Sequence, residues 1–156
     1  MKTLAIVLSA FIFITCYSSD TQLNANKIIQ LKCTIGHDTL DTFNNTFTRN
    51  YYEGVSYTID FSFTLDEQER IISEINKVNF FDLPDKLPHI EPMIYPSEYQ
   101  FCEILLNDRN KKIIWVSISG YEDSDEYKRL NSVINIVREI VRGRKEIKEL
   151  PEEVWY

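Results

Sequence analysis

The sequence predicts a single α+β domain in two layers, an antiparallel sheet of about five strands with two helices on one face. Residues 55–64 alternate strictly between apolar and polar side chains, which is typical of a strand with one buried and one wet face. Residues 64–79 and 124–142 instead carry their apolar side chains at helical spacing, each on one stripe. The expected order of elements is therefore βββαββα.

The first strand is expected at 27–35, because apolar and polar side chains alternate along it. Its apolar positions are Ile29, Leu31, Cys33 and Ile35. The next two strands are expected to form a hairpin, with arms at 44–52 and 55–64 and a turn at 53–54. We expect the helices to cover the sheet face that carries Ile59, Phe61 and Ile104.

The first helix is expected to begin at Thr64 and to end near Asn79. Thr64 and Glu67 have the spacing of a capping box, in which each side chain accepts a hydrogen bond from the other residue's backbone amide. The apolar stripe of this helix consists of Ile71, Ile72, Ile75 and Val78. Residues 82–98 then contain four prolines, which remove amide donors and exclude a helix, so an extended irregular loop is expected.

A second hairpin is expected after this loop, with strands at 98–106 and 111–119 and a turn at 107–110. The closing helix is expected at 124–142, with Gly143 placed to end it. Its apolar stripe consists of Leu130, Val133, Ile134, Val137, Ile140 and Val141. The domain thus covers 27–150, and residues 151–156 form a tail.

The N-terminus has the features of an export signal over residues 1–15. A positive start is followed by an apolar run, Leu4 to Ile14, which is shorter than the roughly 18–20 residues that cross a bilayer. Phe13-Ile14-Thr15-Cys16 resembles a bacterial lipobox, with Phe for the usual Leu and Thr for the usual small residue before the cysteine. We therefore expect lipid on Cys16 and a polar tether over 16–26. The alternative is ordinary cleavage after Ser18 and a soluble secreted or periplasmic protein.

The chain has 156 residues and a formal net charge of −7, which argues against nucleic acid as a partner. Basic residues gather only near the C-terminus, where acidic residues separate them and a solvated helix end explains them. These basic residues are Arg138, Arg142, Arg144 and Lys145. The expected partners are the membrane, through the N-terminal lipid, and a protein of the cell envelope.

If lipid occupies Cys16, the cysteines that remain are Cys33 and Cys102, an even pair in an oxidising compartment. Each lies on the apolar side of an expected strand. Two interpretations stay open, a disulfide between them and two separate buried thiols.

Motifs for catalysis, metal binding or cofactor binding are not found in the sequence. His37 and His89 do not lie in a nucleophile motif, and their spacing to the cysteines does not match a zinc site. The acidic residues at 122–126 lack the spacing of a calcium loop and are expected to stabilise the start of the second helix, with Asp123 as its cap. We therefore predict no catalytic residues, no metal and no cofactor.

An aromatic surface is the candidate binding feature. On the strand at 111–119, one side is formed by Ile114, Val116 and Ile118. If that side faces the core, Ile113 and Trp115 face water, and with Tyr99 they form an interaction surface. The alternative is that the proline-rich loop or the tail covers this surface.

Residues Thr64 to Leu87 (TLDEQERIISEINKVNFFDLPDKL) resemble the helix and the following Asn-Phe-Phe-x-Leu segment, here at 79–83, of a family of small uncharacterised lipoproteins common in Bacteroidota. That family also shares the leading strand, the hairpin and the later strand pair before a closing helix. It commonly carries a Cys-Phe-Gly-x-Cys-Pro-like stretch after its first strand, where this chain has Cys33-Thr34-Ile35-Gly36. The resemblance implies a lipoprotein and no particular activity.

The sequence thus favours an exported, lipid-anchored envelope protein that acts as a non-catalytic binding or interaction module. A first alternative is an envelope hydrolase that uses carboxylates near the proline-rich loop, with Glu91, Glu98 and His89 as its candidates. A second alternative is an inhibitor or subunit of a larger envelope complex.

Overall fold

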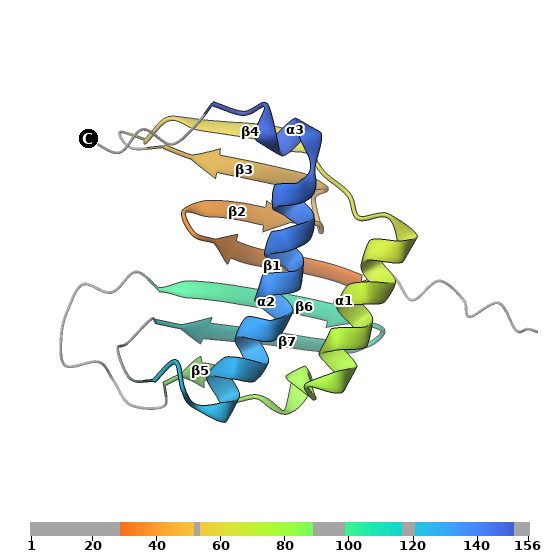
Figure 1. Ribbon diagram of the computed structural model, residues 1–156, viewed down its shortest axis with the longest axis vertical. Helices are drawn as coiled ribbons and strands as arrows, with labels where there is room; N and C mark the ends of the chain where they lie inside the picture. Colours follow the sequence, from red (N-terminus) through yellow and green to blue (C-terminus); the bar gives the residue numbers. More distant parts are fainter. Residues whose placement is uncertain (1–28, 52–53, 89–98, 117–120, 152–156) are drawn as a thin grey trace, which may run out of the picture.

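A computed structural model describes residues 29–51, 54–88, 99–116 and 121–151 of the chain. They form an α+β domain in which one sheet is covered by helices on one face (Figure 1). The strands are β1 (Ile29–Ile35), β2 (Asp38–Asp41), β3 (Thr46–Asn50), β4 (Ser56–Asp60), β5 (Lys86–Leu87), β6 (Gln100–Leu106) and β7 (Arg109–Trp115). Their order in the sheet is β4-β3-β2-β1-β6-β7-β5.

The α+β class is confirmed, but the predicted antiparallel sheet of about five strands is wrong in its details. The sheet has seven strands, and β5 runs parallel to β7, which makes the sheet mixed. The two additional strands are β2, with four residues, and β5, with two residues inside the predicted proline-rich loop. Segments this short contain too little alternation to be recognised in a sequence, since pairing with a neighbour creates them.

The helices are α1 (Leu65–Lys77), α2 (Asp125–Gly143) and α3 (Lys145–Lys148), with a 3-10 turn, η2 (Phe80–Asp82), after α1. The capping box of α1 is confirmed, because Glu67 N–H donates to Thr64 Oγ1 and Thr64 N–H donates to Glu67 Oε2. For α2 the predicted cap is wrong: Ser124, not Asp123, accepts the hydrogen bond from the amide of Tyr127. The short α3 makes the prediction of two helices wrong as well.

The hydrophobic core lies between the helices and the sheet. As predicted, Phe61 and the inner positions of β6 are buried on the side that the helices cover. Fully buried contributions come from both layers, for example Leu31, Cys102, Ile104, Ile113, Ile71, Val133 and Val137. The core therefore extends over the middle of the sheet and fixes α2 directly above β1 and β6 (Figure 1).

The predicted orientation of β7 is wrong. Ile113 pairs with Cys102 and Trp115 pairs with Gln100, and both apolar side chains are buried on the helix-covered face. The strand is apolar on both faces over its last residues, so alternation alone does not distinguish the inner face from the outer one. Its register against β6 decides the orientation, and Trp115 is only 4% exposed.

Arginine side chains hold α2 to the rest of the domain at both of its ends. Arg129 donates to the backbone oxygens of Val78 and Asn79, just after α1. Arg144 donates to Glu67 and to the backbone oxygen of Ser62. Since these contacts fix the axial position of α2, they also fix which of its side chains stand over the ends of β6 and β7.

None of the helices within the described ranges is long and apolar enough to cross a membrane.

Candidate functional site

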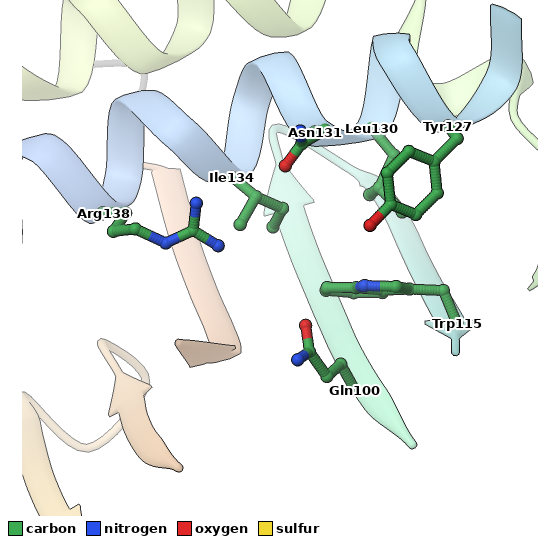
Figure 2. A pocket seen from close by; sticks show the side chains of 7 residues that line it. All are labelled: Gln100, Trp115, Tyr127, Leu130, Asn131, Ile134 and Arg138. Carbon is green, nitrogen blue, oxygen red and sulfur yellow. The ribbon is translucent and has the colours of Figure 1, made fainter. Parts of the chain in front are cut away.

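A small pocket lies between α2 and the point where β6 begins and β7 ends (Figure 2). Its volume is about 110 Å³. It is lined by Gln100, Trp115, Tyr127, Leu130, Asn131, Ile134 and Arg138. All of these residues belong to the described part of the chain, and we call this site the Trp115 pocket.

Two elements place the lining side chains. Gln100 and Trp115 are register partners on β6 and β7, so their side chains stand next to each other on the helix-covered face. Tyr127, Asn131 and Arg138 follow one another on α2 at intervals of four and seven residues, which puts them on one side of the helix. The crossing of α2 over the strands therefore brings the two sets together.

Polar side chains from both layers line the Trp115 pocket. Figure 2 shows the Gln100 amide and the Tyr127 hydroxyl on opposite sides of the indole, the Asn131 amide at the helix, and the guanidinium of Arg138 farther along α2 beside Ile134. The apolar part of the wall is supplied by two buried side chains, Leu130 and Ile134. Trp115, Leu130 and Ile134 are themselves almost fully buried, so the accessible lining is mainly polar and offers several hydrogen-bond donors to a polar group.

Arg138 dominates the electrostatics of the Trp115 pocket. Its Nη1 donates to Asn135 Oδ1 at 2.5 Å, and among the described residues it takes part in no ion pair. Burial lowers the pKa of the Arg138 guanidinium, and the positive charge of Arg142 lowers that pKa further. An arginine stays protonated at neutral pH even so, and the pocket therefore holds a positive charge that no carboxylate of the described chain neutralises.

The volume of the Trp115 pocket limits what it can accept. Pockets for whole small-molecule ligands usually measure roughly 300–1,000 Å³, several times the 110 Å³ found here. The site can therefore hold one side chain or one compact polar group, with the remainder of the ligand outside.

The residues that line the Trp115 pocket include no carboxylate, histidine, cysteine or serine-type hydroxyl, the side chains that most often act as nucleophile or general base. In the described part of the chain no three metal-ligating side chains come together. The hydrolase candidates His89, Glu91 and Glu98 lie outside the described residues, as does the lipidation candidate Cys16.

A second, more open hollow lies at the turn between β1 and β2, close to α3. It is lined by residues that include His37, Asp38, Arg49 and Arg142. Asp38 and Arg49 form an ion pair at 3.5 Å with both side chains largely buried. This hollow therefore contains an ion pair of the fold, and Arg142 extends the positive charge of Arg138 toward it.

The predicted interaction surface is only partly formed. Ile113 is fully buried in the core, and Trp115 is a wall of the pocket and not an exposed platform. Tyr99 is 56% exposed, directly before Gln100. The expectation that the three residues share a wet face is therefore wrong.

Cys33 and Cys102 are register partners on β1 and β6, and the structure joins them by a disulfide with the two Cα atoms 4.2 Å apart. Both residues are fully buried. The bond thus ties the two central strands together beneath α2.

Sequence reasoning missed the polar side chains of α2 that face the Trp115 pocket. Tyr127, Asn131, Ile134 and Arg138 are spaced by four, three and four residues, which indicates one face of a helix. This stripe borders the apolar stripe and was the available signal. The interleaved charges near the C-terminus instead favour a solvated helix end for Arg138.

No protein-family model matches this chain, and no curated protein matches it. The interpretation of the Trp115 pocket therefore rests on its own residues.

Proposed function

We propose that this protein is an exported, lipid-anchored binding module of the bacterial cell envelope that holds a carboxylate group in the Trp115 pocket. The observation that supports this most directly is the guanidinium of Arg138, which lies in a polar pocket without a carboxylate partner among the described residues. A carboxylate matches a guanidinium in both charge and geometry.

The neighbouring charges support an anionic ligand. Arg138 and Arg142 are four residues apart on α2, where like charges repel and destabilise the helix. A bound carboxylate would relieve this repulsion. The chain as a whole has a net charge of −7, so a positive end on α2 is a local feature and not a consequence of composition.

The other side chains of the Trp115 pocket suit the remainder of such a ligand. The amides of Gln100 and Asn131 can donate to hydroxyl or carbonyl oxygens, and the buried Trp115 indole forms the floor beside them. The shared chemistry is a compact carboxylate with polar substituents. An acidic side chain of a partner protein and a sugar acid both have it.

The position of the Trp115 pocket is compatible with an N-terminal anchor. The described chain begins at Ile29, which pairs with Leu106 at one end of β6, whereas Gln100 in the pocket lies at the other end (Figure 1). Six residues of a strand separate these ends by roughly 20 Å. The point at which the expected tether would join the described chain therefore lies at the opposite end of β6 from the pocket.

The carboxylate proposal can be tested through the fluorescence of Trp115. The chain has two tryptophans, and Trp155→Phe leaves Trp115 as the one reporter. We expect glucuronate and N-acetylglutamate, as probes of the two ligand sources, to change its emission, whereas glucose and N-acetylglutamine do not. Arg138→Gln should weaken binding by about 10-fold to 100-fold, the range for a hydrogen bond to a charged group.

Arg70→Gln is the matched control for Arg138→Gln. It also removes one positive charge, but from an exposed ion pair with Glu139 on the side of α1. We expect it to leave the response of Trp115 unchanged. Equal binding by wild type and Arg138→Gln, or no response to either acid by the folded protein, would contradict the proposal.

The anchor is tested separately by incorporation of labelled palmitate. We expect label on the wild-type chain and none on Cys16→Ser. An unlabelled, soluble wild-type product would leave the binding proposal standing and would replace the anchor by ordinary secretion.

A further inference from the structure

The strand β4 forms one edge of the sheet and is exposed. Within the described ranges no strand lies beyond it, and four of its five residues, Ser56, Tyr57, Thr58 and Asp60, are exposed to solvent. An edge strand carries a row of backbone groups without partners, which other chains can pair with.

The hydrogen bonds at both ends of β4 show which backbone groups point outward. Tyr51 N–H donates to Val55 O at 2.8 Å, and Phe61 N–H donates to Asn45 O at 2.8 Å. Both are hydrogen-bonded pairs of the antiparallel β3–β4 hairpin. Since hydrogen-bonded and non-hydrogen-bonded pairs alternate along such a ladder, the residues between them can be assigned in turn.

By this alternation, Tyr57 and Ile59 direct their backbone N–H and C=O groups toward β3. Ser56, Thr58 and Asp60 direct theirs toward the free edge. The edge therefore offers three evenly spaced residues, each with one donor and one acceptor.

We propose that β4 pairs with β4 of a second copy of this chain, antiparallel and centred on Thr58. This register aligns Thr58 with Thr58 of the second copy, and Ser56 of each copy with Asp60 of the other. Three such pairs exchange about six backbone hydrogen bonds and join two sheets into one. A two-fold axis normal to the sheet keeps the helices of both copies on the same side.

The side chains of β4 are complementary to themselves in this register. On the outer face the carboxylate of Asp60 meets the hydroxyl of Ser56, and two threonines meet at the axis. On the helix-covered face Tyr57, which is 46% exposed, meets the partly buried Ile59. No like charges face each other, whereas a shift that aligned Asp60 with Asp60 would place two carboxylates together.

The strand also lacks the features that prevent edge pairing. It contains no lysine and no proline, and Asp60 is its one charged residue. Five residues of edge with hydroxyl, aromatic and β-branched side chains suit strand addition. A foreign strand could use the same hydrogen bonds, but the match of Ser56 to Asp60 about Thr58 favours a second copy.

Single cysteines placed on β4 can test both the pairing and its register. Each variant also carries Cys16→Ser. The introduced cysteines are then the ones that do not belong to the Cys33–Cys102 disulfide. In the full chain, we expect Thr58→Cys to give a covalent dimer with a short bismaleimide, because paired Cα atoms lie about 5.5 Å apart. Ser56→Cys alone should not give this dimer. In the proposed register the Ser56 positions of the two copies are offset by four residues, which separates the two thiols by roughly 14 Å.

Two further variants control for chance collisions and for folding. Thr48→Cys introduces a thiol on the adjacent strand, on the same face as Thr58, and should remain monomeric on a denaturing gel. Ser56→Cys combined with Asp60→Cys should restore the covalent dimer. Unchanged thermal unfolding of each variant shows that it is folded.

The outcomes separate the alternatives. Absence of a dimer in folded Thr58→Cys would overturn the proposal. A product of another mass would identify a foreign strand as the occupant of the edge and would also overturn pairing with a second copy. The cross-link does not involve the Trp115 pocket, so its outcome is independent of the carboxylate proposal.

Discussion

The two edge strands of the sheet, β5 and β4, differ in length, in charge and in how far they are buried. β5 has two residues, lies between Pro84 and Pro88, and inserts Leu87 into the core with 2% exposure. The preceding residue, Asp85, forms an ion pair with Lys111 on β7, so charged side chains lie beside this edge. β4 has five residues that are mostly exposed, with Asp60 as its one charge.

The halves of the sheet next to these edges are also stabilised differently. The half with β5, β6 and β7 is held by apolar packing under α1 and α2. The half with β2, β3 and β4, which we call the polar half, adds Leu40 and Phe47 to the core but is also tied to the C-terminal segment by polar contacts. Arg49 pairs with Asp38 and donates to the backbone oxygens of Leu150 and Pro151. A sheet can thus protect one edge by burying it and leave the other available for a partner.

The largest expected effect tests the buried edge. Leu87→Ala removes a fully packed side chain and leaves a cavity, so the free energy of unfolding should fall by about 2–5 kcal/mol. Chemical denaturation measures this change. A loss of less than 1 kcal/mol would mean that β5 is only loosely attached.

A smaller loss is expected for the polar half of the sheet. Arg49→Met keeps most of the side-chain length but removes the ion pair with Asp38 and the hydrogen bond to the carbonyl oxygen of Leu150. The free energy of unfolding should fall by roughly 1–3 kcal/mol. Hydrogen exchange should quicken around α3 before it does so around β7, whereas equal changes in both would contradict the division into halves.

Acid should weaken the polar half through Asp41 on β2. Burial raises the pKa of this carboxyl, but hydrogen bonds from Lys32 and Asn44 outweigh that effect and lower the pKa below its ordinary value. A lowered pKa in the folded state stabilises the protein above the unfolded value of about 3.9, and this stability is lost as the pH falls through the folded value. Asp41→Asn should therefore flatten the pH dependence of unfolding below about pH 4.

Glu74 provides the comparison on α1. Hydrogen bonds from Ser132 and then Lys77 lower the pKa of Glu74. Protonation of this carboxyl therefore also destabilises the folded protein over the same acidic range. Glu74→Gln should flatten the pH dependence without changing hydrogen exchange in β2 and β3. If either variant left the acid titration of stability unchanged, the corresponding carboxyl would not be linked to folding.

The smallest effect is expected at the exposed edge. Tyr57→Ser removes a side chain that is nearly half exposed, and in dilute protein the free energy of unfolding should change by less than about 1 kcal/mol. At high protein concentration a larger loss is expected if β4 pairs with a second copy, because stability then includes association. A concentration-independent effect would argue against that pairing.

Local patterns predicted the long elements well. The capping box at Thr64 and Glu67 and the apolar stripes of both long helices lie within single segments, and each was confirmed with small shifts at the ends. The faces of β7 were not predictable in the same way. Ile113, Ile114 and Trp115 are consecutive and apolar, so the sequence contains no contrast from which to infer the inner face.

The Trp115 pocket was predictable only in part. Its two contributions are far apart in the chain, since Trp115 ends β7 and Arg138 lies near the end of α2. The stripe from Tyr127 to Arg138 could have been recognised on the helix, but its neighbours on the sheet could not. They meet because Arg129 and Arg144 fix the axial position of α2 over β6 and β7.

The sequence by itself determined the α+β class, the long helices and strands, and the core residues of α2. These follow from the spacing of apolar side chains and from caps, which act over a few residues. Only the tertiary structure decided the short strands β2 and β5, the inward orientation of Trp115, the pairing of Cys33 with Cys102 and the exposure of β4. Each of these depends on contacts between segments distant in sequence, and the free energy that selects among such contacts comes from burial and register rather than from local pattern.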